Sequence, residues 1–222
     1  IPAHTYGILL SILVGIVIVG GIERIGKTTE KIVPLMVVLY VSASLFIIIL
    51  NITKLPMVIS TIITEAFSPL AIYGGFIGVL VTGIKRAVFS NEGGVGSASI
   101  AHSAAKTDEP VREGIVAMIG PFIDTIVVCF MTASVILITA DINPLYQPGS
   151  GINGAELTSA AFGSVIPWFP TILSIVVFLF SYSTIISWYY YGDKGWKFLF
   201  GDSSINLYKY LYLGCVILGS IA

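Results

Sequence analysis

Long apolar runs without charged residues constrain this chain more than any other feature. Residues 32–52 and 170–191 contain no charge, and residues 114–140 contain only Asp124. A helix needs about 20 residues to cross a bilayer. Inside hydrocarbon every backbone polar group needs an internal partner, which one long run provides only as a helix. A barrel would show alternating segments of about 10 residues. We therefore expect an all-α, polytopic membrane protein.

The composition excludes a soluble globular domain. Hydrophobic residues make up 56% of the chain, charged residues 10%, and the mean hydropathy is +0.97. Soluble domains are about 25% charged. The formal net charge of −1 argues against nucleic acid as a partner, because nucleic-acid binding needs a basic patch. Cys129 and Cys215 lie inside apolar runs, where a buried free thiol is the usual state.

The charge-free runs predict six transmembrane helices. Their approximate bounds are residues 6–21, 32–52, 66–84, 114–140, 170–191 and 210–222. Segments 55–67 and 156–168 are expected to be peripheral helices, the second a lid with a capping box formed by Asn153 and Glu156. The last run stops short of the length of a span. Residues 1–222 are therefore expected to be a single transmembrane portion of a longer protein.

The basic residues predict the orientation of these spans. Of 11 Lys and Arg residues, all but Lys54 fall in segments 23–31, 85–113 and 192–209. Lys and Arg are enriched in cytoplasmic loops. We therefore expect these three segments to be cytoplasmic, the first span to run from outside to inside, and both ends to face outward.

Three glycines interrupt the third predicted span, where positions 73–78 read YGGFIG. Each glycine weakens a helix by about 1 kcal/mol relative to alanine. One interpretation is a discontinuous helix whose backbone groups bind a solute at mid-membrane. The other is a packing face for a neighbouring helix, since Gly74 and Gly78 form a GxxxG pair. The pattern alone favours packing.

Asp124 and a group of hydroxyls are the other candidate site residues. An ionisable group near the bilayer centre costs about 2.5–3.5 kcal/mol on insertion scales, so Asp124 faces a cavity or a partner. It is either functional or a hydrogen-bonded tie between helices. Ser181, Ser183, Thr184 and Ser187 supply oxygens of the kind that sodium prefers. The same hydroxyls can bond back to their own helix, and helix packing is the simpler interpretation without further context.

No pattern indicates an enzyme. HExxH, CxxC and P-loop motifs do not occur in the sequence. The glycine-containing loop 90–106 follows no predicted strand, so it does not fit a dinucleotide-binding loop. His102 stands alone and is expected to be a solvent or packing residue.

A long stretch resembles one transporter family. Positions 90–133 read SNEGGVGSASIAHSAAKTDEPVREGIVAMIGPFIDTIVVCFMTA, and flanking pieces read GGIERIGKTTEKIVPLMVVLY, AIYGGFIG and FSYSTIISWYYYGDKGWKFLFG. Together they are similar to the alanine or glycine:cation symporters, also called sodium:alanine symporters. The sequence departs from the family pattern in reading NEGGVGS where NEAGLGS is expected.

This resemblance implies a leucine-transporter-like fold built from two inverted repeats of five helices. The six transmembrane helices would form part of that core, as its fourth to ninth helices. Gly74, Gly75, Phe76, Ile77 and Gly78 would then bind the substrate, together with a helix outside this sequence.

The resemblance also implies the ion sites and the activity. Ser183 and Thr184 would bind sodium, with Asp124 and Thr125 at a candidate second cation position. The function implied is sodium-coupled import of small neutral amino acids, alanine or glycine, by alternating access. The protein would be a multi-pass protein of the cell membrane, with the lipid bilayer and the amino acid as its partners. The alternatives are a sodium symporter for another small solute and, from another class, an ion channel.

Overall fold

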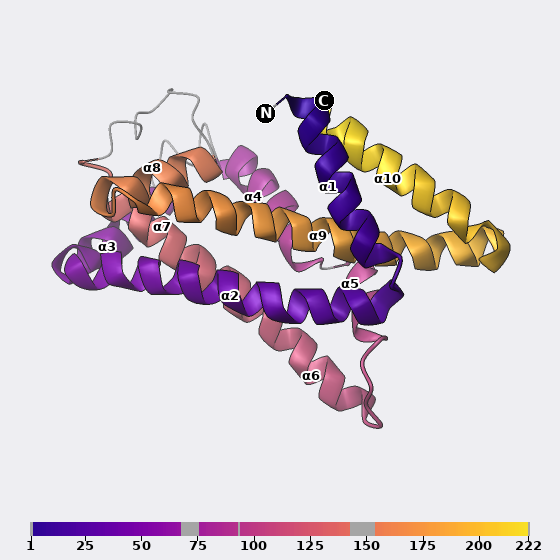
Figure 1. Cartoon of the computed structure of the whole chain (residues 1–222). Helices are drawn as coiled ribbons and strands as arrows, with labels where there is room; N and C mark the ends of the chain where they lie inside the picture. The colour runs from indigo at the N-terminus through magenta and orange to yellow at the C-terminus, as the bar shows by residue number, and fades with distance from the viewer. Residues whose placement is uncertain (1, 68–75, 93, 143–153, 222) are drawn as a thin grey trace. The chain divides into compact units, whose positions relative to one another are not determined.

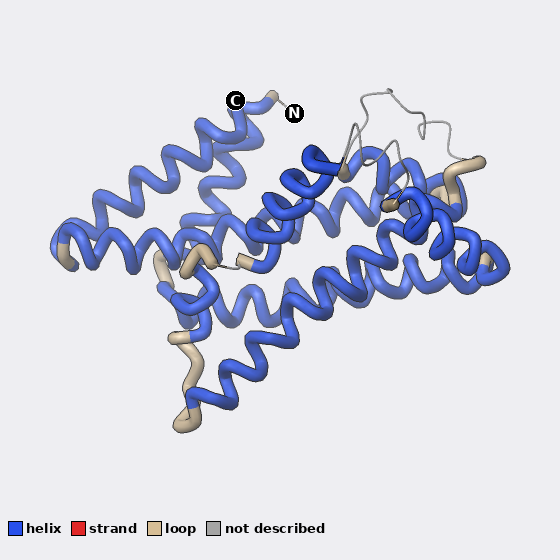
Figure 2. Tube along the Cα trace, turned by 180° about the vertical axis from the view of Figure 1, so that it is seen from behind, coloured by secondary structure: helices blue, strands red, loops and turns tan. Residues whose placement is uncertain are grey.

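The computed structural model describes residues 2–67, 76–92, 94–142 and 154–221, and every regular element in these ranges is a helix (Figures 1 and 2). In chain order the elements are α1 Ala3–Ile18, α2 Gly21–Leu50, η1 Ile52–Lys54, α3 Leu55–Ala66, α4 Phe76–Asn91, α5 Ser97–His102, α6 Pro110–Pro121, η3 Phe122–Val128, α7 Cys129–Ile138, α8 Ala155–Val165, α9 Phe169–Phe200, η4 Asp202–Ser204 and α10 Ile205–Ile221. The element η3 is a π-helix, whereas η1 and η4 are 3₁₀ turns. The predicted all-α class is confirmed.

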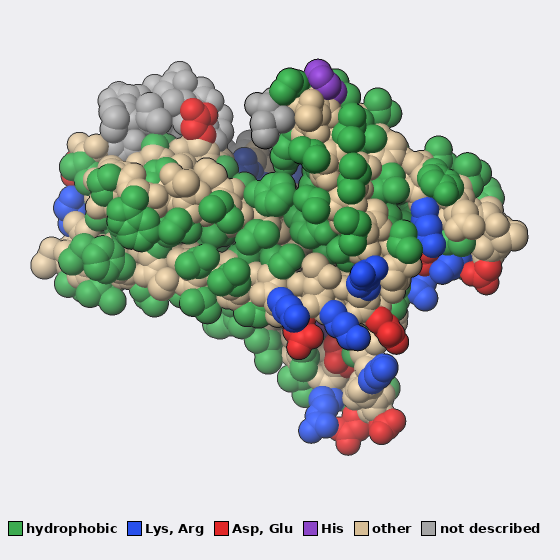
Figure 3. All heavy atoms as spheres, viewed as in Figure 1, with side chains coloured by type: hydrophobic (Ala, Val, Ile, Leu, Met, Phe, Trp, Pro, Cys, Tyr) green, Lys and Arg blue, Asp and Glu red, His purple; other side chains and the backbone are tan. Residues whose placement is uncertain are grey.

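Four helical stretches in the described residues are long and apolar enough to cross a membrane. They are Gly21–Leu50, Pro110–Ile138, Phe169–Phe200 and Asp202–Ile221, and α1 is an apolar helix of 16 residues. Hydrophobic side chains cover much of the surface seen in Figure 3, and apolar exposure of this extent marks membrane contact. These helices confirm a polytopic membrane protein. The third predicted span, 66–84, stays a prediction, because residues 68–75 lie outside the described ranges.

The helices extend beyond the apolar runs that predicted them. α2 begins at Gly21 and α9 continues to Phe200, so the segments 23–31 and 192–200, which we expected to be loops, are helical. α10 begins at Ile205 and not near residue 210. Lys, Arg and Glu are good helix formers. Charged residues in this chain therefore mark the end of an apolar run without ending the helix.

The described chain forms two compact units: unit 1, Ile1–Val37 with Val176–Ala222, and unit 2, Val38–Ile175. In unit 1, α1 lies along α10 (Figure 1). A Cβ atom on Gly7 would lie only 2.9 Å from Ser220 Cβ, so this close approach requires glycine. The Ser11 hydroxyl donates to the Leu213 carbonyl at 3.2 Å.

Two tyrosines connect α9 to both of these helices in unit 1. The Tyr182 hydroxyl donates to the Leu13 carbonyl of α1 at 2.9 Å, and the Tyr212 hydroxyl of α10 donates to the Ile185 carbonyl at 2.6 Å. Such interhelical hydrogen bonds stabilise helix association in lipid, where apolar contact alone gives little preference for protein over acyl chains.

Unit 2 is organised around an apolar core to which four transmembrane or peripheral helices and the start of α9 contribute. Its buried members are Ala43, Ile47, Ile48, Val58, Met131, Val135, Ile138, Ala161, Phe162, Ile166, Phe169 and Leu173. Phe162 of α8 stacks on Phe169, with ring centroids 5.0 Å apart. The Tyr40 hydroxyl hydrogen-bonds that of Thr132 at 2.5 Å, which fastens α2 to α7.

Both segments predicted to be peripheral helices are helical, as α3 and α8, while their peripheral position stays a prediction. The predicted capping box of α8 is wrong in register: the N-cap is Gly154, without a side-chain hydrogen bond, and Glu156 is the second helical residue. A capping box needs the glutamate at the third. Asn153 itself lies outside the described residues. α8 buries Ala161 and Phe162 in the core of unit 2.

Candidate functional site

The predicted fourth span contains a π-helix at its centre. α6 ends at Pro121, the π-helix covers Phe122–Val128, and α7 continues from Cys129. Proline has no N–H group to bond the carbonyl one turn earlier, and this missing bond directly precedes the widened turn. Short π-helical segments inside α-helices occur frequently at functional sites. Asp124 and Thr125 both lie on this segment.

Two residues at the end of α4 bind these two residues of the π-helix. The Ser90 hydroxyl donates to the Asp124 carboxylate. The Asn91 amide nitrogen donates to the Thr125 hydroxyl oxygen at 2.9 Å, and that hydroxyl faces the Asn91 amide oxygen at 3.3 Å. We call Ser90, Asn91, Asp124 and Thr125 the α4–π network. It brings four oxygen-bearing side chains and one negative charge together.

The α4–π network borders a cavity of about 530 Å³. Ser90, Asp124 and Thr125 line it, and so do Lys85 and Arg86 of α4. None of the ion pairs among the described residues involves Asp124. The oxygens match the ligand preference of hard cations. The two basic side chains make the electrostatic potential in the cavity more positive, which opposes cation binding. The geometry therefore supports both interpretations of Asp124, as a tie between helices and as a cation ligand.

The hydroxyls predicted to bind sodium lie in unit 1, on α9. The Ser183 side chain is buried, and its hydroxyl donates to the Phe180 carbonyl at 2.8 Å. The Thr184 hydroxyl donates to the same carbonyl at 3.0 Å. Both side chains thus form the local bonds expected of hydroxyls that pack within a helix. Because they act as donors, their oxygen lone pairs remain available to a cation.

The predicted substrate residues are only partly described. Gly74 and Gly75 lie outside the described residues. Phe76, Ile77 and Gly78 are the first three residues of α4. The first N–H groups of a helix have no acceptor within it, and a helix N-terminus favours anions. The start of α4 is therefore suited to a carboxylate.

His102 is not isolated, contrary to the sequence-based expectation. Its Nδ1 lies 2.6 Å from Glu113 Oε1, which connects α5 to α6. Spacing did not indicate this pair, because the two residues lie on different helices joined by a loop.

Sequence reasoning also missed Ser90 and Asn91 as candidate site residues. Both open the 90–133 stretch that carries the family resemblance. Ser90 and Asn91 carry a hydroxyl and an amide where an apolar helix meets a polar loop. That position could have indicated them as candidate site residues.

Comparison with known proteins gives one consistent result. A family model described as the sodium:alanine symporter family matches residues 1–222. "Sodium/alanine symporter AgcS" of Methanococcus maripaludis is 43% identical over 97% of this chain and 48% of its own length. "Probable sodium/glutamine symporter GlnT" of Bacillus subtilis is 36% identical over 98% of this chain and 45% of its own.

A third relative, "Sodium/proton-dependent alanine carrier protein" of Bacillus sp. (strain PS3), is 32% identical over 90% of this chain and 47% of its own length. The chain therefore spans about half the length of the curated relatives that it matches.

Proposed function

Because this chain belongs to the sodium:alanine symporter family, we propose that the protein is a sodium-coupled symporter that imports small neutral amino acids, alanine or glycine, across the cell membrane by alternating access. The observation that carries this proposal is the family match over the whole chain. Inward sodium movement supplies the driving force, with about 2.3 kcal/mol per charge per 100 mV from the membrane potential. Coupling requires that bound sodium raise the affinity for the amino acid.

We assign the amino acid to the start of α4. A zwitterion in the membrane needs both charges satisfied, since an unpaired buried charge is too costly. The first N–H groups of α4, at Phe76–Gly78, would receive the carboxylate. Backbone carbonyls at Gly74 and Gly75 would receive the ammonium group, and glycine allows the ligand to approach the backbone closely.

Ser183 and Thr184 are assigned to sodium. Their hydroxyl hydrogens are directed to one carbonyl, so two oxygens lie on adjacent residues with lone pairs free for an ion. The remaining ligands of this shell would come from helices outside the sequence.

Asp124 and Thr125 are assigned to a second cation, with Ser90 and Asn91 as additional oxygen donors. The name of the relative from strain PS3 includes both sodium and proton. A proton on the Asp124 carboxyl is therefore the natural alternative occupant of the α4–π network.

Uptake by the full-length protein in proteoliposomes tests the function. Labelled alanine should accumulate in a saturable manner under an inward sodium gradient, and equal potassium should not replace sodium. Unlabelled glycine should compete strongly. Stronger competition by glutamine would favour the alternative of another solute, in line with the name of one relative. A non-saturable flux without solute accumulation would indicate a channel and contradict the proposal.

A further inference from the structure

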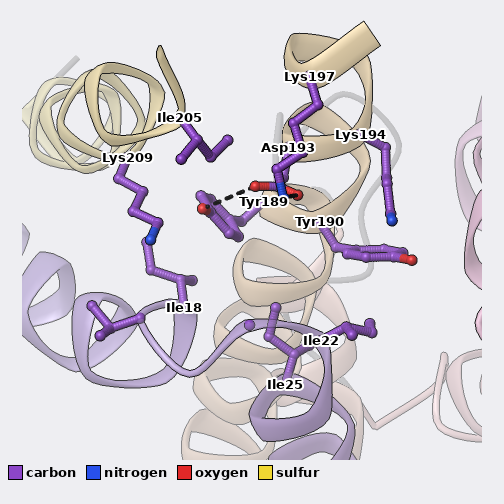
Figure 4. A pocket seen from close by; sticks show the side chains of 12 residues that line it. Ile18, Ile22, Ile25, Tyr189, Tyr190, Asp193, Lys194, Lys197, Ile205 and Lys209 are labelled. Carbon is purple, nitrogen blue, oxygen red and sulfur yellow. Dashed lines mark hydrogen bonds and ion pairs between the residues drawn. The ribbon is translucent and has the colours of Figure 1, made fainter. Parts of the chain in front are cut away.

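A basic pocket of about 290 Å³ lies in unit 1, and none of the residues assigned above lines it. The end of α1, the start of α2, the later part of α9 and the start of α10 all contribute to it. Figure 4 shows the side chains of Lys194, Lys197 and Lys209 around Tyr189 and Asp193, with isoleucines below them. We call this the lysine pocket.

The lysine pocket carries an uncompensated positive charge. Asp193 is only 8% exposed; it pairs with Lys197 at 2.9 Å and accepts a hydrogen bond of 3.4 Å from the Tyr189 hydroxyl. No ion pair in the described part of the chain involves Lys194 or Lys209. Three lysines against one aspartate leave a net charge of +2 among the lining residues. Lys194 is exposed and Lys209 half-buried, so both ammonium groups are accessible to an anion.

The two uncompensated lysines lie on opposite sides of Tyr189 in Figure 4. The Lys194 ammonium sits over the Tyr190 ring, 5.3 Å from its centroid. α9, Tyr189 and Asp193 stand between the two ammonium groups in Figure 4, so an anion in the pocket would contact Lys209 and meet only the longer-range field of Lys194. At about 290 Å³ the pocket is near the lower limit of small-molecule sites, about 300–1,000 Å³, which suits a headgroup better than a large solute.

The sequence around the lysine pocket predicts that it lies at the depth of lipid headgroups. Residues 188–191 form the aromatic cluster WYYY, and Trp and Tyr gather at membrane interfaces. Lys194 and Lys197 follow within two turns on the same helix, in a segment whose basic residues predict the cytoplasmic side. Val19 and Ile22 line the pocket and are 68% and 39% exposed, so an apolar surface adjoins the charges.

We propose that the lysine pocket binds the headgroup of an anionic phospholipid from the cytoplasmic leaflet. The phosphate lies against Lys209, Lys194 adds positive charge on the other side of Tyr189, and the acyl chains extend along Val19 and Ile22. Basic pockets between transmembrane helices on the cytoplasmic side are a recognised chemistry for anionic headgroups. Asp193 pairs with Lys197, so the Lys197 ammonium group is less available to the phosphate.

Lipid binding to the full-length protein, purified in a non-ionic detergent, tests this proposal by native mass spectrometry. The probes are dioleoylphosphatidylglycerol, dioleoylphosphatidylcholine and inorganic phosphate. Each lysine near an anionic headgroup contributes roughly fivefold in affinity. The double variant Lys194→Gln/Lys209→Gln should therefore bind phosphatidylglycerol up to about 25-fold more weakly, and Lys209→Gln alone about fivefold more weakly.

Two control pairs separate the pocket from general charge. Lys27→Gln/Lys31→Gln removes the same charge from exposed positions on the same predicted side but outside the pocket, and should change binding less than twofold. Lys194→Arg/Lys209→Arg should retain binding. Equal binding of both lipids, or equal loss in the control pair, would overturn the proposal. Displacement of the lipid by millimolar inorganic phosphate would assign the pocket to a free anion and would also overturn it.

Discussion

The two pairs of candidate ion-binding residues differ in what holds them. In unit 1, Ser183 and Thr184 bond to a carbonyl of their own helix, so their side-chain hydrogen bonds stay within α9. In unit 2, Asp124 and Thr125 bond to side chains of another helix, so their positions depend on α4 and on the π-helix together. The first pair can lose a hydroxyl without disturbing a contact between helices. The second cannot change without altering how α4 meets the π-helix.

This difference explains why the same experiment has different meanings at the two pairs. A weaker ion dependence after a change at Thr184 reports directly on ligation. Asp124 carries both a charge and a helix contact, so one variant is needed to remove the charge and another to remove the contact. The following predictions use this contrast, from the largest expected effect to the smallest.

The largest effect is expected at the start of α4. Gly75→Leu should abolish alanine binding, because a leucine side chain would occupy the space proposed for the solute and prevent its approach to the backbone. Equilibrium binding of labelled alanine to purified protein measures this. Gly26→Leu, at a helical position with nothing within 4 Å of an added Cβ atom, is the control and should retain binding. Normal alanine affinity in well-folded Gly75→Leu protein would exclude this placement.

Asp124 should show the next largest effect. Asp124→Asn keeps a group that can accept from Ser90 but removes the charge, whereas Ser90→Ala removes the hydrogen bond and keeps the charge. If Asp124 binds a cation, Asp124→Asn should lower sodium-driven alanine uptake at least tenfold, because losing a charged ligand costs about 1.4 kcal/mol or more of binding free energy. Ser90→Ala should lower uptake less. The opposite order would identify Asp124 as a tie between helices.

Thr184→Ala should raise the sodium concentration for half-maximal uptake about fivefold to tenfold. Losing one oxygen ligand costs about 1 kcal/mol or slightly more of sodium-binding free energy. Alanine affinity at saturating sodium should largely recover. Ser174→Ala is the matched control, since Ser174 of α9 makes the same bond to a carbonyl one turn earlier, at 2.9 Å from Pro170 O. An unchanged sodium dependence in Thr184→Ala would make these hydroxyls packing residues.

The smallest effect on transport itself is expected from a change that alters only the stability of unit 1. Gly192 faces Tyr208, whose hydroxyl an added Cβ atom would overlap, and Tyr208 stacks on Tyr189 at 5.5 Å. Overpacking of this kind costs about 1–3 kcal/mol, so Gly192→Ala should lower the thermal unfolding temperature. Gly195→Ala, on the same helix with nothing within 4 Å, should be neutral or slightly stabilising. Equal unfolding temperatures for the two variants would contradict the close packing around Tyr208.

Much of the fold was predictable because bilayer thickness and backbone hydrogen bonding leave few options for long apolar runs. The runs 32–52, 114–140 and 170–191 all became helices. The ends of these helices were less predictable. α2 and α9 continue through Lys27 and Lys194, because lysine favours a helix as well as an apolar residue does. Asp124 could be identified as a candidate from its place in an apolar run, since a charge there requires a partner.

The sequence by itself determined that this is a helical membrane protein, and it placed Asp124, Thr125, Ser183 and Thr184 within helices of apolar character. Only the tertiary structure decided which groups meet those side chains. The bonds from Ser90 and Asn91 to the π-helix join residues 34 positions apart, and no periodicity encodes such a separation. Likewise the lysine pocket joins α1, α2, α9 and α10. A local pattern specifies which face of a helix is apolar, but the neighbour of that face depends on how the whole chain packs.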